Sequence, residues 1–75
     1  YEIYNKEVVI LSEKITLKAA RVNAGLTQED VSKAMNVSLP TIAKWEIESG
    51  ELRMKQALKL CKLYKKNIDD IFFED

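Results

Sequence analysis

The sequence predicts an all-α domain, a bundle of five short helices that follows a short N-terminal arm in extended or β conformation. The chain has 75 residues, of which 47% are hydrophobic, with two glycines and one proline. That size and composition fit one small globular domain rich in helix. After position 13 the apolar residues recur at helical spacing, and turn residues separate the resulting segments. We therefore divide the chain into an arm, residues 1–13, and a helical domain, residues 14–75.

The first expected helix runs from about residue 16 to residue 24. Leu17, Ala20 and Ala24 form one apolar stripe at positions i, i+3 and i+7. Gly25 follows, and glycine is the residue that most often ends a helix in a left-handed conformation. The stripe predicts the buried side of this helix, and the glycine predicts its end.

The second expected helix starts after Thr27, an N-cap residue. Asp30 stands three positions later, which resembles a capping box with Asp in place of the usual Glu or Gln. Its buried face is expected to consist of Val31, Ala34 and Met35. Asn36 comes next and adopts a left-handed backbone more readily than other non-glycine residues, so a tight turn is predicted there.

The third expected helix begins at Ser38, a second N-cap candidate. Pro40 is tolerated in its first turn because the N–H groups there have no partner within the helix. Ile42 and Trp45, three positions apart, are expected to face inward. For Trp45 a place in the core is favoured over stacking on a nucleobase.

Two more helices complete the predicted bundle. The fourth runs from about residue 54 to residue 64 and carries lysines on its outer face. Its buried side is expected to consist of Met54, Ala57, Leu58, Cys61 and Tyr64. The fifth runs from Asn67 or Ile68 to Phe73. It is expected to close the core with Ile68, Ile71 and Phe72.

The N-terminal arm differs in kind from the rest of the chain. Residues 1–4 and 8–10 are rich in β-branched and aromatic side chains and lack helical spacing, so part of the arm is predicted to be a strand. A lone strand needs a partner. A hairpin through residues 5–6, pairing with a second chain, and a mobile arm all remain open. The chain begins at Tyr1 rather than Met, which leaves open whether other residues precede it.

Composition also narrows the function. Cys61 is the single cysteine and histidine is absent, so neither an internal disulfide nor a zinc site of Cys and His ligands is expected. Without histidine the commonest general base is missing, and we expect no enzyme, no cofactor and no small-molecule substrate. The longest apolar run, residues 8–11, is far too short to span a bilayer, so no membrane partner is expected. A reducing, cytoplasmic location fits best, with Cys61 as a small buried hydrophobe.

Charge is balanced overall but segregated along the chain. Twelve Lys and Arg oppose twelve Asp and Glu. Residues 14–66 contain eleven basic against five acidic residues, or +6, whereas residues 1–13 and 67–75 together carry −6. A basic body with acidic ends presents a surface that suits a polyanion.

Residues 26–46 are predicted to form one capped helix, a short turn and a second capped helix, which is the pattern of a helix-turn-helix. At this point the sequence resembles the Cro/cI-type helix-turn-helix family of phage repressors, also called the XRE family. The resemblance covers residues 15–73 and rests on the entry at residues 25–28, on the Trp45-Glu46 pair and on the ending at residues 68–72. It implies a five-helix, phage-repressor-like bundle that binds DNA with its third helix in the major groove.

Two departures from the family pattern stand out. The family usually has Asn-Gly after the Trp-Glu pair, followed by a basic loop. Here Glu48 and Glu51 place two carboxylates near the expected phosphates, which lowers the expected affinity. Asn36 replaces the usual turn glycine, a milder change.

Four residues of the third helix are expected to read bases: Leu39, Pro40, Thr41 and Lys44. They project from the side opposite Ile42, and the N-terminal part of such a helix faces base edges. Lys44 suits guanine O6 and N7, Thr41 a base or a phosphate, and the two apolar residues thymine methyl groups. The alternative for Leu39 and Pro40 is a helix start with singly exposed apolar side chains, which needs no functional explanation.

The residues expected to contact DNA phosphates are Thr27, Gln28, Ser38, Arg53, Lys55 and Lys18. By the resemblance, Gln28 matches the family's phosphate-clamping glutamine; the alternative is a solvated first-turn residue. Ser38 is favoured as a cap, although its hydroxyl also suits a phosphate. The three cations are placed by position alone, and each could equally be an ordinary solvated side chain. The later lysines 59, 62, 65 and 66 are expected to form a solubilising face.

The resemblance also implies a partly buried salt bridge between Arg21 and Glu46, which ties the first helix to the end of the third. From all this we expect a sequence-specific regulator of transcription that binds duplex DNA, as a repressor and as a homodimer on a two-fold operator. The rival reading is a protein-interaction module on the same scaffold that contacts another regulator without binding DNA. Zero net charge and the carboxylates Glu48 and Glu51 favour the rival.

Overall fold

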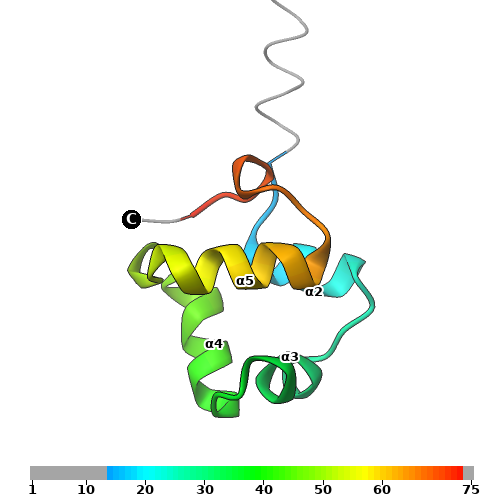
Figure 1. Ribbon diagram of the computed structural model, residues 1–75, viewed down its shortest axis with the longest axis vertical. Coiled ribbons are helices and arrows are strands. Elements are labelled where there is room, and N and C mark those ends of the chain that lie inside the picture. Colours follow the sequence, from blue (N-terminus) through cyan, green and yellow to red (C-terminus); the bar gives the residue numbers. More distant parts are fainter. Residues whose placement is uncertain (1–13, 74–75) are drawn as a thin grey trace, which may run out of the picture.

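The computed structural model describes residues 14–73, and this part of the chain is all-helical (Figure 1). Its elements in order are α2 (Leu17–Asn23), α3 (Gln28–Met35), α4 (Leu39–Ile47), the 3₁₀ turn η1 (Ser49–Glu51), α5 (Met54–Tyr64) and the 3₁₀ turn η2 (Ile68–Asp70). In Figure 1, α5 crosses the middle of the molecule, and α3 and α4 lie below it. The predicted arm, residues 1–13, falls outside the described residues.

Threonine or serine caps begin α2, α3 and α4, and two of these caps, Thr27 and Ser38, were predicted. The Thr16 hydroxyl accepts a hydrogen bond from the Ala19 N–H at 3.1 Å and starts α2. At the start of α3, the Thr27 hydroxyl accepts from the Asp30 N–H at 3.0 Å, and the Thr27 N–H donates to Asp30 Oδ2 at 2.9 Å. The predicted capping box with Asp is confirmed. These bonds, the backbone bond first, lower the pKa of Asp30 below its ordinary value.

The predicted turn at Asn36 is also confirmed. Asn36 ends α3 with φ 58° and ψ 46°, in the left-handed region that Asn tolerates better than most residues. Val37 N–H then donates to Ser32 O at 3.1 Å, which satisfies a carbonyl at the end of α3. Ser38 caps α4 by accepting from the Thr41 N–H at 3.3 Å. Three residues therefore suffice to turn the chain from α3 into α4.

One hydrophobic core joins all four helices to the segment after η2. Its fully buried members are Leu17, Ala20, Val31, Ile42, Leu60, Cys61, Tyr64 and Ile71. Trp45 is partly buried and packs against this cluster, in agreement with its predicted place in the core. Cys61 is buried and free, and burial raises the pKa of its thiol.

Several residues predicted to be buried are exposed instead, namely Ala24, Ala34, Met54 and Leu58. Ala24 lies beyond the last residue of α2. In α5 the buried side consists of Ala57, Leu60, Cys61 and Tyr64, at positions i, i+3, i+4 and i+7. The sequence of α5 holds a second apolar stripe, Met54 and Leu58, one turn apart, and the prediction merged the two stripes while leaving out Leu60.

The predicted fifth α-helix is wrong, because Ile68–Asp70 forms only one 3₁₀ turn. The chain then becomes extended and forms a parallel bridge between Ile71 and Ile15. Ile15 N–H donates to Asp70 O at 3.1 Å, and Phe72 N–H donates to Ile15 O at 2.8 Å. Extended backbone alternates its side chains, so Ile71 is buried, Phe72 is exposed and Phe73 packs against the core. Phe72 was therefore wrongly predicted to be in the core.

A buried ion pair connects the first three helices. Arg21 Nε lies 2.6 Å from Glu46 Oε2, and the two side chains are only 10% and 6% exposed. Arg21 also donates from Nη1 to Leu26 O at 2.9 Å, and Gln28 Nε2 donates to Glu46 Oε1 at 3.0 Å. One carboxylate of α4 thus holds side chains from both α2 and α3.

We predict that Glu46→Ala lowers the free energy of unfolding by about 3–5 kcal/mol, because Arg21 would remain as a buried, unpaired charge. Glu48→Ala is the matched control. Glu48 lies two residues later and forms an exposed pair with Lys44 at 3.9 Å, which contributes about 0–1 kcal/mol. Thermal and denaturant unfolding of both variants measure the difference. Equal losses of stability in the two variants would contradict a structural role for the buried pair.

The raised pKa of Tyr64 predicts that the folded protein loses stability at alkaline pH. Burial, and next the negative charge of Glu46, raises this pKa from the ordinary 10.0 to about 12. Between about pH 10 and pH 12 the unfolded chain releases the phenol proton while the folded chain retains it, so stability falls as pH rises. From pH 9 to pH 11.5, the wild type should lose about 1–3 kcal/mol more than Tyr64→Phe in denaturant unfolding. Parallel losses in the two proteins would refute the assignment.

Candidate nucleic-acid interface

The helix pair α3 and α4, with the turn at residues 36–38, forms a helix-turn-helix unit. In Figure 1 this unit lies below α5, on the side away from η2. Ile42 is fully buried and Trp45 is partly buried, so they hold one side of α4 against the core. The other side of α4 faces solvent and is the candidate contact surface.

The four expected base readers lie at the start and on the outer side of α4. Leu39, Pro40 and Lys44 are exposed, and Thr41 is partly exposed. Thr41 Oγ1 lies 2.8 Å from the Ser38 hydroxyl, and either can be the donor. Lys44 and Pro40 are one helical turn apart and therefore share a face. This face brings together an ammonium group, a hydroxyl and apolar side chains.

The charge of Lys44 has a partner within the chain. Its Nζ lies 3.9 Å from Glu48 Oε1, one turn farther along the helix, and both side chains are exposed. Glu51 follows in η1 and is also exposed. The two carboxylates at the end of α4 therefore offset the positive potential of the contact surface, although an exposed pair of this kind is weak and readily exchanged.

At the start of α3, Gln28 is partly exposed and its amide is already engaged. Donation to Glu46 Oε1 uses one of its two amide hydrogens, which leaves the second hydrogen for another acceptor. Thr27 is exposed, and its hydroxyl caps the Asp30 N–H. Glu29 and Asp30 stand in the same first turn. Their charges satisfy the positive end of the helix and compete with a phosphate there.

A basic hollow of about 270 Å³ lies beside the helix-turn-helix unit, and we call it the α4–α5 hollow. Its lining residues are Met35, Val37, Trp45, Arg53, Lys55, Gln56 and Lys59. It therefore brings two of the expected phosphate contacts, Arg53 and Lys55, next to the turn and to α4. No carboxylate lines it, and the ion pairs described within residues 14–73 include none of its three cations.

Lys59 was predicted to lie on a solubilising face, so its place in this cluster was missed. Its spacing of four residues from Lys55 is the signal that could have found it, since residues i and i+4 of a helix lie side by side. Lys18, in contrast, was predicted to contact a phosphate but does not line this hollow. It is exposed on α2, and no contact described for residues 14–73 joins it to the hollow or to the outer side of α4.

Within residues 14–73 no group of three or more Cys, Asp or Glu side chains is arranged to hold a metal ion. None of the helices in that range combines the length and apolar character needed to cross a membrane.

Comparisons with known proteins agree with this geometry. A family model described as helix-turn-helix matches residues 17–71, which is more than half of the chain. An uncharacterized HTH-type transcriptional regulator from Methanocaldococcus jannaschii is 40% identical over 63 residues, which cover 83% of this chain and 96% of that protein. No solved structure matches the chain. From the α3–α4 unit and these matches together, we conclude that the chain belongs to the XRE family of helix-turn-helix proteins.

Proposed function

We propose that this protein is a sequence-specific transcriptional regulator that binds duplex DNA and acts as a repressor in the cytoplasm. The observation that carries the proposal is the α3–α4 unit, whose second helix is anchored by Ile42 and presents its other side to solvent. The family match over residues 17–71 supports it, as does the similarity to a protein named as a transcriptional regulator. The protein is not proposed to be an enzyme.

In this proposal α4 enters the major groove, which is wide enough to admit a helix. Lys44 donates to guanine O6 and N7, and releases Glu48 as it does so. Thr41 bonds a base or a phosphate, and Leu39 and Pro40 contact thymine methyl groups. The exposure of Leu39, Pro40 and Lys44 supports these roles.

Phosphate contacts would flank the inserted helix. Arg53 and Lys55 are the best supported, because both line the α4–α5 hollow and neither is paired in the described part of the chain. Thr27, Gln28 and Ser38 would contribute backbone and side-chain donors at the starts of α3 and α4. Lys18 would be a separate contact from α2. Together these contacts would position the protein without reading sequence.

A homodimer would place two copies of α4 on a two-fold operator. The two half-sites must lie about 34–36 Å apart so that both helices enter the major groove on one face of the duplex. A protein bound there excludes others from the same DNA, which is how we propose that it represses transcription.

The second candidate function is a protein-interaction module that uses the same surface on another regulator. The Lys44–Glu48 pair, Glu51 and the zero net charge favour it. Selection of bound duplexes from a random pool, followed by footprinting of the enriched sequence, separates the two. An enriched sequence with a protected half-site supports DNA binding, and the absence of any enriched duplex at low salt supports the second function.

We predict that Lys44→Ala weakens binding to the selected site by about 1–3 kcal/mol, or about 5- to 150-fold, because a base contact is lost. Binding to random duplex DNA should change much less, so the ratio of specific to random affinity falls. Lys66→Ala, two residues beyond the end of α5, is the control for loss of one positive charge. Equal effects of both variants on the ratio would remove Lys44 from the base-reading set.

A second prediction concerns salt. Arg53→Ala should reduce the slope of log affinity against log salt concentration by about 0.9, the value for one phosphate contact on duplex DNA. The loss should be similar for selected and random duplexes, because phosphates carry no sequence information. Titrations at four or more salt concentrations provide the slope. If the slope of Arg53→Ala matches that of the wild type, Arg53 does not contact a phosphate.

A further inference from the structure

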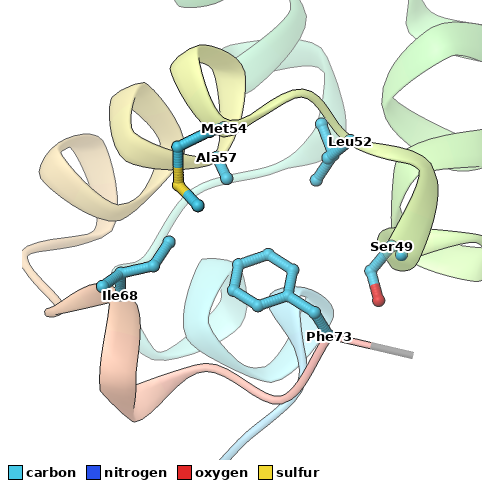
Figure 2. A pocket seen from close by; sticks show the side chains of 7 residues that line it. Ser49, Leu52, Met54, Ala57, Ile68 and Phe73 are labelled. Carbon is cyan, nitrogen blue, oxygen red and sulfur yellow. The ribbon is translucent and has the colours of Figure 1, made fainter. Parts of the chain in front are cut away.

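An apolar face lies on α5 beside η2, away from the helix-turn-helix unit. Met54 is 65% exposed and Leu58 is 50% exposed, one helical turn apart. We call this pair the α5 stripe. A hollow of about 230 Å³ adjoins it, and Figure 2 shows the side chains of Leu52, Met54, Ala57, Ile68 and Phe73 around that hollow. Large apolar side chains gathered around an open hollow are typical of an interaction surface.

Opposite charges lie on the two sides of the α5 stripe. On one side is η2, which packs toward Ala57 and Met54 through Ile68 and carries the exposed Asp69. On the other side are Lys55 and Lys62. Successive residues of a helix are about 100° apart around its axis. Lys55 and Lys62 therefore point roughly a quarter turn farther from the buried side of α5 than Met54 and Leu58 do. The ion pairs described within residues 14–73 include none of these three charges.

We propose that a second copy of this chain docks on the α5 stripe, with a two-fold axis that runs parallel to α5. Such an axis places the acidic η2 edge of one copy, which carries Asp69, against the lysine edge of the other, which carries Lys55 and Lys62. This contact forms twice in the dimer, and the apolar residues of the two stripes lie between the two contacts. An axis across α5 would instead oppose like charges. The arrangement is complementary to itself, which is what a symmetric dimer requires, and it gives a role to the segregation of charge in a chain of zero net charge.

The inference deepens the proposed homodimer and rests on it. It also leaves most of the proposed DNA surface free, because the α5 stripe includes no residue of α3 or α4 and neither Arg53 nor Lys59 from the α4–α5 hollow. Lys55 lies at the lysine edge and also lines that hollow, so Lys62 is the cation assigned to the dimer alone. Loss of the dimer should therefore spare the contacts of each copy with its own half-site.

The test is sedimentation equilibrium of the full chain without DNA over a range of concentrations. The wild type should approach twice the chain mass of 8.6 kDa. Leu58→Glu should weaken self-association at least ten-fold, because two carboxylates would then be buried near the two-fold axis. Val22→Glu is the matched control, since Val22 is 57% exposed on α2, outside the stripe. It should associate like the wild type.

Circular dichroism of Leu58→Glu checks that the helices remain, and Met54→Ser replaces it if they do not. A wild type that stays monomeric at every concentration would overturn the inference and assign the stripe to another occupant. Equal association of Leu58→Glu and wild type, or equal weakening by Val22→Glu, would also overturn it. If a monomeric wild type still binds a selected half-site, this inference and the proposed homodimer fail while the proposed DNA binding stands. If a stable dimer binds no duplex, the proposed DNA binding fails while this inference stands.

Discussion

The carboxylate of Glu46 is the constraint on which the rest of the structure depends. It lies in α4, is almost fully buried, and accepts hydrogen bonds from Arg21 of α2 and Gln28 of α3. A buried charge is costly unless it is fully paired, so these partners leave α4 little freedom to move away from the other helices. Arg21 in turn holds the Leu26 carbonyl at the α2–α3 connection. The angle at which α4 meets its neighbours is thus fixed by polar contacts as well as by packing.

That constraint connects stability with recognition. Gln28 is both a partner of Glu46 and an expected phosphate contact, so a bound phosphate would meet a side chain whose position the ion pair has already set. Pre-positioned donors lose less conformational entropy on binding than free ones. In contrast, Lys44 is held only by an exposed pair with Glu48, which is weak enough to be exchanged for a base in the proposed complex. The side chain of Gln28 is therefore held in place, whereas that of Lys44 is adjustable.

Local rules predicted most of this fold. Thr27, Ser38 and Asn36 each act within four residues of themselves, and the starts of α3 and α4 and the tight turn between them followed from these residues. The predictions were wrong where contacts between residues far apart in the sequence determine the local structure. Ile71 pairs with Ile15 across the chain, which makes residues 71–73 extended rather than helical. No local pattern could show which of the two apolar stripes of α5 the other helices would cover.

The candidate site was predictable to a similar degree. Spacing alone put Leu39, Pro40 and Lys44 on one outer face, but the neutralising position of Glu48 and the gathering of Lys59 with Arg53 and Lys55 depend on how α4 and α5 meet. The two helices are joined by residues 48–53, which include η1, and this connection is too irregular for its direction to be inferred from residue types. The electrostatic character of the surface was for that reason the least predictable property.

The bridge between Ile15 and Ile71 has a consequence for the order of folding. It closes a loop of more than fifty residues, whereas the capped helices and the α3–α4 turn involve near neighbours. Long loops close slowly because their entropy must be lost first. During synthesis on the ribosome, α2 to α5 can form as they emerge, while Ile15 waits for its partner until Ile71 has left the exit tunnel. The segment that leads into α2 is thus made before the four helices but secured after them.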